Sequence, residues 1–420
     1  MTPNASADAR PRDLSEDWLA VLVGGALIAL VLVGIRPSLP RFAWGTDTSP
    51  ASALISLSNL SRAFRVGVLV LAPLIVGASF LGARLATFVP GIIGLYALAW
   101  LAQVAAGHVA SAAWGLEYVI FSLAIGLAAR HAFQLPAWLK DAVRTEYYIK
   151  AGLVVLGATV FFNEIVGAGL RGIGQALVVV LSVWAFCFWL AARLRVDDEL
   201  ATMLASAVAI CGVSAAIATC GAIQGDKKKL SYVTSLVLVV AMPMMVLMPW
   251  AAQQMGLSDT VAGAWLGGTL DTSASVVAAG EMLGSAGRDT AVVVKLSQNA
   301  LIGVAAFFLT IWWAMRRPTE GRPAASLRVI WERFPKFVFG FLMASLLFSF
   351  GLGPDAVAAT RGPVNAIRTT LFAMAFVSIG LETSLGHLVT TDNGRPALAF
   401  IGGQVFNLIV TLAAAYLFFG

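Results

Sequence analysis

Charged residues are scarce in this chain. Asp, Glu, Lys and Arg make up 12% of its 420 residues, against about 25% in a soluble globular protein, and the mean hydropathy is +0.85. Charge-free stretches such as Gly172–Ala192 and Leu230–Ser258 are long enough to cross a bilayer as helices. A soluble fold is thereby excluded, and the composition predicts an all-α polytopic membrane helical bundle.

Cysteine and histidine are also scarce. Cys187, Cys211 and Cys220 lie within apolar stretches, and the three histidines are scattered, so we expect neither a disulfide framework nor a zinc site. No Ser-His-Asp array, P-loop or phosphate-cradling glycine motif is present. We therefore expect no enzyme, no cofactor and no ATP-driven transport. The net charge is +6, and most Lys and Arg lie between the apolar segments, where membrane topology requires them. The positive charge therefore does not indicate a nucleic-acid partner.

Uninterrupted apolar segments of roughly the length of a spanning helix recur along the chain. They cover residues 18–35, 66–83, 88–107, 114–130, 149–167, 172–192, 230–252, 289–315, 334–353, 363–386 and 396–419. The first is not followed by a convincing cleavage site, so we interpret it as a retained span and not a signal peptide. We divide the chain into an N-terminal extension with two extra spans, residues 1–87, and a transporter core, residues 88–420.

Two further apolar segments, 200–225 and 260–280, are interrupted in the middle by Gly, Ser, Thr and an Asp. A plain lipid anchor has no reason to place such residues at mid-depth. Freed backbone N–H and C=O groups are tolerated there only where they face protein or a watery cavity. Interruptions of this kind form binding sites in secondary transporters, and we expect a site where these two segments meet.

The sequence leaves open whether these segments cross the membrane. With a cytoplasmic N-terminus and two full crossings, Lys227, Lys228 and Lys229 fall on the outer side, against the positive-inside rule. Two re-entrant segments that enter from opposite sides place more Lys and Arg inside. A discontinuous helix that crosses completely is also long enough, so both arrangements remain.

The two interrupted segments resemble each other. At an offset of 59 residues, Ser214-Ala215 aligns with Ser273-Ala274, and Gly221 aligns with Gly280. Chance similarity between small-residue helices is one explanation. The other is an inverted repeat, the usual architecture for alternating access.

Asp271 is the strongest single candidate for a functional residue. An ionised carboxylate at mid-depth costs at least about 3 kcal/mol, and Thr272, Ser273 and Ser275 follow it in the sequence. The alternative is a structural role, because an Asp before Thr-Ser-Ala-Ser can cap the start of a half-helix. A half-helix that starts at this depth would itself form part of the site.

Lys295 and Gln298 are the next candidates, on the apolar segment 289–315. Lys295 could extend to the headgroups, pair with Asp271, or neutralise an anionic substrate. Gln298 is close to the same face and could donate hydrogen bonds to an oxyanion.

A third group of candidates surrounds the first interruption and comprises Gly212, Val213, Ser214 and Ala215. If a helix restarts here, its free N–H groups and partial positive charge suit an anion. Close packing of helices through small residues is the structural alternative. Two such N-termini with a Lys would bind an anion, whereas one N-terminus with an Asp would serve a cation or proton.

At these residues the chain resembles the bacterial sulfate exporter family (YeiH family). The similar elements are Gly152–Gly157, Ile210–Ala215, Thr269–Gly280, Val294–Leu296 and Gly380–Leu385. The resemblance extends from about residue 88 to the end, and the Cys-Gly-x-Ser-Ala and Asp…Val-Val-Ala-Ala-Gly elements are its most specific part. It implies a secondary transporter of the inner membrane with a fold similar to cation/proton antiporters.

The chain departs from the family pattern at three positions. Leu270 stands where the family usually has His, Gln298 where it has Arg, and Thr159 where it has Arg. Two cations and one titratable group are thus missing, which weakens the expectation of a divalent anion and of proton coupling.

Three functions follow as hypotheses. The first is an exporter of a small inorganic or organic anion (sulfate, sulfite or an organosulfonate) in the inner membrane, with a cytoplasmic N-terminus and H⁺ or Na⁺ as a coupling ion. The second is a cation- or proton-coupled antiporter that uses Asp271, with Lys295 as its resting partner. The third is a membrane scaffold or sensor whose interruptions are packed shut. All three have the lipid bilayer as a partner and are compatible with an oligomer.

Overall fold

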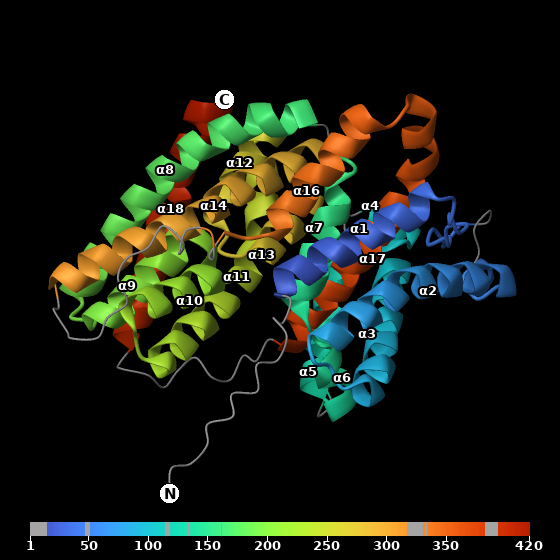
Figure 1. Ribbon diagram of the computed structural model, residues 1–420, viewed down its shortest axis with the longest axis horizontal. Helices are drawn as coiled ribbons and strands as arrows, with labels where there is room; N and C mark the ends of the chain where they lie inside the picture. The colour runs from blue at the N-terminus through green and yellow to red at the C-terminus, as the bar shows by residue number, and fades with distance from the viewer. Residues whose placement is uncertain are drawn as a thin grey trace, which may run out of the picture.

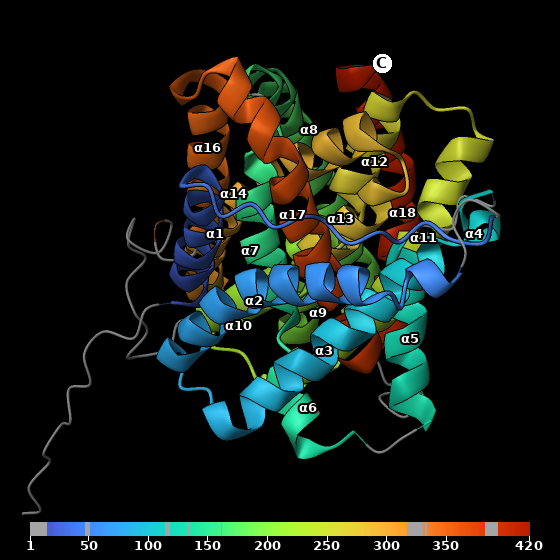
Figure 2. The same cartoon turned by 90° about the vertical axis from the view of Figure 1, so that its right-hand side faces the viewer.

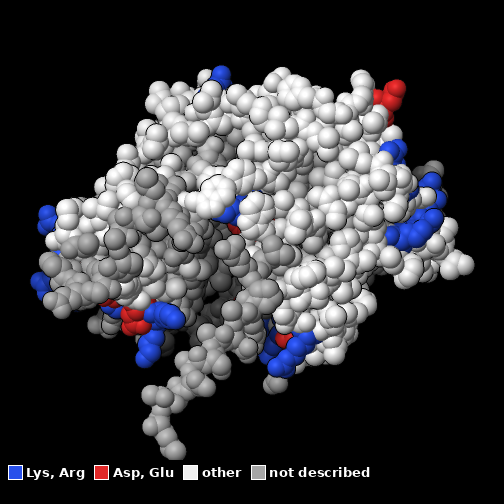
Figure 3. All heavy atoms as spheres, viewed as in Figure 1, with Lys and Arg blue, Asp and Glu red and all other residues white. Residues whose placement is uncertain are grey.

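The protein is a helical bundle. The computed structural model describes residues 15–46, 51–113, 118–132, 135–160, 162–316, 331, 334–382 and 394–420, and this part of the chain contains no β-strand beyond one isolated bridge between Trp44 and His108. Eight described helices are long and apolar enough to cross a membrane. On the face shown in Figure 3, most of the visible charged side chains lie near the edges, and one small group lies near the middle. The predicted all-α membrane bundle is confirmed.

In chain order, the described helices are α1 (Glu16–Leu32), α2 (Leu57–Phe80), α3 (Leu85–Ala106), α4 (Val109–Ala113), α5 (Tyr118–Ala132), α6 (Ala137–Ala142), α7 (Thr145–Gly157), α8 (Phe162–Arg193), α9 (Asp198–Ser206), α10 (Gly212–Ile223), α11 (Lys227–Gln254), α12 (Asp259–Thr269), α13 (Ser273–Glu281), α14 (Ser285–Arg316), α16 (Phe337–Leu346), α17 (Pro354–Glu382) and α18 (Arg395–Phe419). A 3₁₀ turn covers Ala51–Ala53, and π-helical turns cover Ala207–Cys211 and Leu347–Gly351.

The helices form two groups that lie side by side in Figure 1. The panel comprises α1, α2, α3, α5, α6, α7, α16 and α17, and the hairpin group comprises α8 to α14 with α18. Most helix–helix contacts fall within a group. Across the boundary, α13 contacts α7 and α17, and α16 contacts α8.

Glycines allow the central helices of the panel to approach closely. Gly24 of α1 and Gly340 of α16 both face Val154 of α7, and an added Cβ would lie 2.7 Å and 2.8 Å from its side chain. Small residues at such positions are the usual means of packing membrane helices. The panel therefore has α7 at its centre, and Figure 2 shows α2 lying across it, in contact with α1, α3 and α17.

The boundary predicted between the spans 149–167 and 172–192 is wrong. The chain turns at residues 158–160, after α7, and α8 then runs without a break from Phe162 to Arg193. The glycines near residue 170 do not end a helix. Gly172 instead brings α8 close to α14, where an added Cβ would lie 3.1 Å from Ser297 Oγ.

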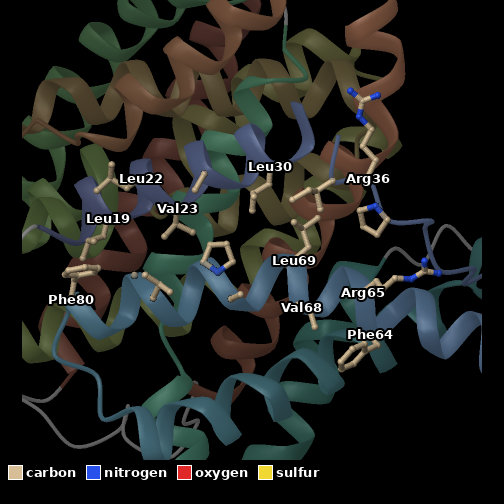
Figure 4. Close-up of a pocket in the computed structure, with 17 residues that line it drawn as sticks. Leu19, Leu22, Val23, Leu30, Arg36, Phe64, Arg65, Val68, Leu69 and Phe80 are labelled. Atoms are coloured by element: carbon tan, nitrogen blue, oxygen red, sulfur yellow. The ribbon is translucent and has the colours of Figure 1, made fainter. Parts of the chain in front are cut away.

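A groove of about 950 Å³ separates α1 from α2. Its walls are mainly aliphatic and aromatic, and Figure 4 shows Val23 and Leu30 of α1 facing α2 across it. Arg36 and Arg65 lie at the same end of the groove. Its apolar lining suits contact with lipid chains.

Candidate functional site

The first interrupted segment is a hairpin. Lys229 Nζ, at the start of α11, lies 2.8 Å from Asp197 Oδ2 and 3.1 Å from Glu199 Oε2 at the start of α9. The Asp226 N–H also donates to Glu199 at 3.4 Å. The chain thus leaves the segment where it entered, so α9 and α10 are its two arms. By length and composition the 26 residues Asp198–Ile223 could span a membrane, but these contacts exclude a crossing.

The second interrupted segment is also a hairpin. Gly263 and Gly267 of α12 pack against Gly287 and Ala291 of α14 in parallel order. The other arm, α13, runs the opposite way along α14, because its first residue, Ser273, accepts a hydrogen bond from Asn299 Nδ2 at 3.1 Å while its end lies at the start of α14. Both arms therefore begin or end at the N-terminus of α14.

The two hairpins point toward each other from opposite ends of α11. We call the end where the chain enters and leaves a hairpin its mouth. The mouth of the first hairpin lies at Lys229, at the start of α11. Near the other end of α11, Gln253 donates to the carbonyl of Met282, after α13, at 3.2 Å. At 1.5 Å per residue, the 28 residues of α11 span about 42 Å. Of the two arrangements that the sequence left open, the structure has the oppositely directed re-entrant one.

Three side chains tie the hairpin tips together. Where a helical arm ends, its last carbonyls have no partner within the helix. Lys295 Nζ donates to the carbonyls of Ile210 at 2.6 Å and Leu270 at 2.7 Å. Gln298 Nε2 donates to those of Ala209 and Gly268 at 2.9 and 3.2 Å.

Asn407 of α18 supplies the third link. Its Nδ2 donates to the carbonyls of Val208 at 3.1 Å and Thr269 at 3.2 Å, and its Oδ1 accepts from Thr411 at 2.7 Å. Three consecutive carbonyls at each tip, those of residues 208–210 and 268–270, thus accept hydrogen bonds. Each of the three donor side chains bonds one carbonyl in each hairpin. The positive Lys295 also lies where two arms present the negative ends of their dipoles.

Gly212 shapes the first tip. It follows the π-helical turn and has φ +43° and ψ −112°, a region that residues with a Cβ rarely adopt. An added Cβ would lie 2.6 Å from Val237 Cγ1 and 3.1 Å from the Asp271 carbonyl oxygen. Glycine is therefore required both by the backbone and by the approach of the second hairpin.

Asp271 lies between the arms of the second hairpin with 2% of its surface exposed. Its Oδ2 accepts a hydrogen bond from Gln404 of α18, and its Oδ1 has no hydrogen-bond partner among the described residues. It forms no ion pair with Lys295, whose three donors are all engaged. Asp271 does not cap α13; that cap is Thr272, whose Oγ1 accepts from the Ser275 N–H at 3.0 Å.

A cavity of about 320 Å³ opens beside the hairpin tips, and we call it the tip cavity. It lies between the groups: Val213, Ser214, Thr272, Ser273 and Asn299 line it from the hairpin group, and Asp17, Glu146, Lys150 and Lys336 from the panel. Lys150 Nζ lies 2.9 Å from Asp17 and 3.9 Å from Glu146. At about 30 Å³ per water, the tip cavity holds roughly ten water molecules, enough for a small hydrated solute.

The structure divides the predicted site residues into two sets. Val213, Ser214, Thr272 and Ser273 line the tip cavity. The others do not line it. Gly212 and Ala215 are buried in the first hairpin, Asp271 and Ser275 are buried in the second, and Lys295 and Gln298 are among the side chains that join the tips.

Sequence reasoning missed Gln404, Asn407 and Thr411 of α18. They are 3%, 0% and 0% exposed, and recur at intervals of three and four residues, so they share one helix face. A stripe of polar residues in an apolar span is a signal that could have identified them. Among the described residues, no group of three or more His, Cys, Asp or Glu could hold a metal ion, and the three cysteines are buried and free.

Comparisons with known proteins agree over most of the chain. The sequence profile of the family described as Conserved hypothetical protein 698 matches residues 90–399. A UPF0324 membrane protein of Nitratidesulfovibrio vulgaris is 36% identical over 356 residues, which cover 82% of this chain and 62% of the relative. The UPF0324 membrane protein of Rhodopirellula baltica is 38% identical over 336 residues, which cover 77% and 62%.

The UPF0324 membrane protein of Nitrosomonas europaea is 30% identical over 343 residues, covering 71% of this chain and 69% of the relative. The chain spans about 62% of the length of the first two relatives. No solved structure matches. The profile and the relatives together show that this chain, a multi-pass membrane protein, belongs to the Conserved hypothetical protein 698 family, whose members here are named UPF0324 membrane proteins.

Proposed function

We propose that this protein is a secondary transporter, not an enzyme, that exports a small anion across the bacterial inner membrane. Sulfate, sulfite and organosulfonates are the candidate substrates, following the resemblance to the sulfate exporter family. The N-terminus would be cytoplasmic. The observation that carries the proposal is the position of the tip cavity, between two helix groups and at the tips of two opposed hairpins.

The helix termini at the tip cavity favour an anion. Ser214 lies in the first turn of α10, which has no side-chain cap, and Ser273 is the first residue of α13. Both line the cavity. Free N–H groups and the partial positive charge of two helix N-termini thus meet the same space, while two acidic and two basic side chains from the panel offset each other.

A second cavity supports alternating access. It has a volume of about 610 Å³ and also lies between the helix groups, but just after the end of α7 and in the first turns of α14. Val293 lines this cavity and Asn299 the tip cavity, so the two are about 9 Å apart along α14 at 1.5 Å per residue. A shift of one group against the other would need to open only this short barrier.

The opposed hairpins also support an inverted repeat, which we include in the proposal. Ser214 and Ser273, which align at the 59-residue offset, both lie in the first turn of the returning arm of their hairpin. Equivalent arms that meet at the centre from opposite sides are the pattern of inverted-repeat transporters. A scaffold or sensor with interruptions packed shut does not fit the open tip cavity.

Transport of labelled sulfate, sulfite and taurine into proteoliposomes tests the proposal. Ser214→Leu would narrow the tip cavity from an exposed position and should lower the transport rate on the order of tenfold, the equivalent of about 1.4 kcal/mol. Ser231→Leu, at an exposed serine on α11, is the matched control. Absence of transport for all three anions, or equal rates for the two variants, would refute the proposal.

A cation- or proton-coupled antiporter is the second candidate. The observation in its favour is the buried Asp271, whose Oδ1 has no hydrogen-bond partner. Asp271→Asn should abolish ion-coupled transport if the carboxylate carries the ion, and should leave anion transport above background if it does not. Counterflow without an ion gradient separates the two results, because it requires substrate exchange alone.

A further inference from the structure

The second cavity, at the start of α14, is lined by arginines from three helices, and we call it the arginine cavity. Arg171 comes from α8, Arg288 from α14, and Arg361 and Arg368 from α17. Arg361, Asn365 and Arg368 are spaced i, i+4 and i+7, so they lie on one face of α17. At about 30 Å³ per water, its 610 Å³ would hold roughly twenty water molecules.

The positive charge of this cavity is only partly neutralised. Glu281 lies 3.6 Å from Arg288 and 3.1 Å from Arg368, and Asp289 lies 2.7 Å from Arg288. These two carboxylates face four guanidinium groups. Neither Arg171 nor Arg361 has an ion-pair partner in the described part of the chain, which leaves two positive charges unbalanced.

Arg368 adds an independent indication of a ligand. Its side chain is 7% exposed, yet within the described part of the chain its Nε has no hydrogen-bond partner. Buried polar groups almost always have one. The Nη1 atom lies close to Glu281 but also lacks a well-oriented hydrogen bond, so this guanidinium retains donors for a further acceptor.

We propose that the arginine cavity is a binding site for a small oxyanion such as sulfate or a sulfonate. Guanidinium groups present paired donors that match two oxygens of such an anion. Arg171 and Arg361 would supply the unbalanced charge, and the unpartnered N–H groups of Arg368 would donate hydrogen bonds to an oxygen of the anion. The first turn of α14, at Ser285, adds the partial positive charge of a helix N-terminus.

This inference goes beyond the proposed transport, because binding here requires no translocation. If the protein is also an anion transporter, the arginine cavity is the site that a substrate meets on the side opposite the tip cavity. An anion bound between α17 of the panel and α14 of the hairpin group would also offset the repulsion among the arginines that the two groups bring together.

Thermal unfolding of the full chain in lipid nanodiscs, titrated with sodium sulfate, tests the proposal. Sodium chloride at equal ionic strength is the salt control. Arg171→Gln and Arg361→Gln alter exposed side chains without ion pairs, so both variants should fold. Arg65→Gln, on an exposed helical position of α2, is the matched control. Each titration is repeated in the Ser214→Leu background, which narrows the tip cavity.

Sulfate should raise the unfolding temperature saturably where chloride does not. Arg171→Gln and Arg361→Gln should each raise the apparent Kd about tenfold, as expected for loss of one charge-assisted hydrogen bond, and Arg65→Gln should leave it unchanged. Absence of saturation, an equal loss in Arg65→Gln, or loss of binding in Ser214→Leu alone would overturn the inference. Sulfate binding with no transport of sulfate, sulfite or taurine would keep this inference and remove the transport proposal.

Discussion

Lys295 and Gln298 lie one helical turn apart on α14, with Lys295 Nζ 2.8 Å from Gln298 Oε1. Together they bond four backbone carbonyls, two in each hairpin. The sequence suggested Lys295 as a counter-charge for a substrate. In the structure its ammonium group instead donates hydrogen bonds to backbone carbonyls of the protein itself. The pair joins the ends of α9 and α12, so the two hairpins are expected to move as one body.

Lys295→Met should therefore destabilise the protein whether or not an anion is present. The substitution leaves the carbonyls of Ile210 and Leu270 without a donor, which costs stability, but it also removes a buried charge, which offsets part of that cost. The net loss in the free energy of unfolding should be about 2 kcal/mol. The free energy of unfolding in mixed micelles, measured by titration with SDS, gives the value. Lys140→Met, at an exposed lysine, is the control. An unchanged stability with lost anion binding would instead identify Lys295 as a substrate ligand.

Gly212→Ala should also destabilise the protein, by about 3 kcal/mol from strained backbone and overpacking together. The added Cβ meets Val237 at 2.6 Å, and φ +43° disfavours it independently. Gly25→Ala is the matched control, because Gly25 is helical with nothing within 4 Å, and should change the stability by less than about 1 kcal/mol. If both variants unfold at the same SDS fraction, the positive φ of Gly212 and its close approach to Val237 would be contradicted.

The interruptions could be predicted from the sequence because Gly, Ser, Thr and Asp are out of place in apolar segments. The cluster Lys227–Lys229 also favoured the re-entrant arrangement, and Lys229 indeed closes the mouth of the first hairpin. The roles of Lys295 and Gln298 could not be predicted, since they depend on which carbonyls the two tips present. Asn407 is distant in the sequence from both tips, and its partners are known only once α18 is packed.

The mouth of the first hairpin should respond to pH through Asp197. Partial burial would raise the pKa of this carboxyl, but hydrogen bonds from Lys229 and from the N–H groups of Glu199 and Leu200 outweigh it and lower the pKa below its ordinary value. A lowered pKa contributes stability above the unfolded value of about 3.9, and this is lost as the pH falls through the folded value.

Lys229→Gln should therefore flatten the loss of stability that occurs as the pH falls below about 4. The effect should stay below about 1 kcal/mol, because the ion pair is partly exposed and screened by solvent. Unfolding by SDS at several pH values measures it. Lys228→Gln, an exposed neighbour on the same turn, should retain the parent's pH dependence. An identical pH profile for Lys229→Gln and the parent would show that the ion pair does not hold the mouth closed.

The topology of the hairpins can be tested by labelling single cysteines with an impermeant maleimide in sealed vesicles of known orientation. Two full crossings would place position 193 on the same side as 254, and 227 on the same side as 285. Two re-entrant hairpins instead pair Arg193→Cys with Lys227→Cys on one side, and Gln254→Cys with Ser285→Cys on the other, since each hairpin returns the chain to its side of entry. All four positions are exposed. The background variant replaces the native cysteines with alanine: Cys187, Cys211 and Cys220. We expect the second pattern, and the first would refute the opposed-hairpin architecture on which the tip cavity depends.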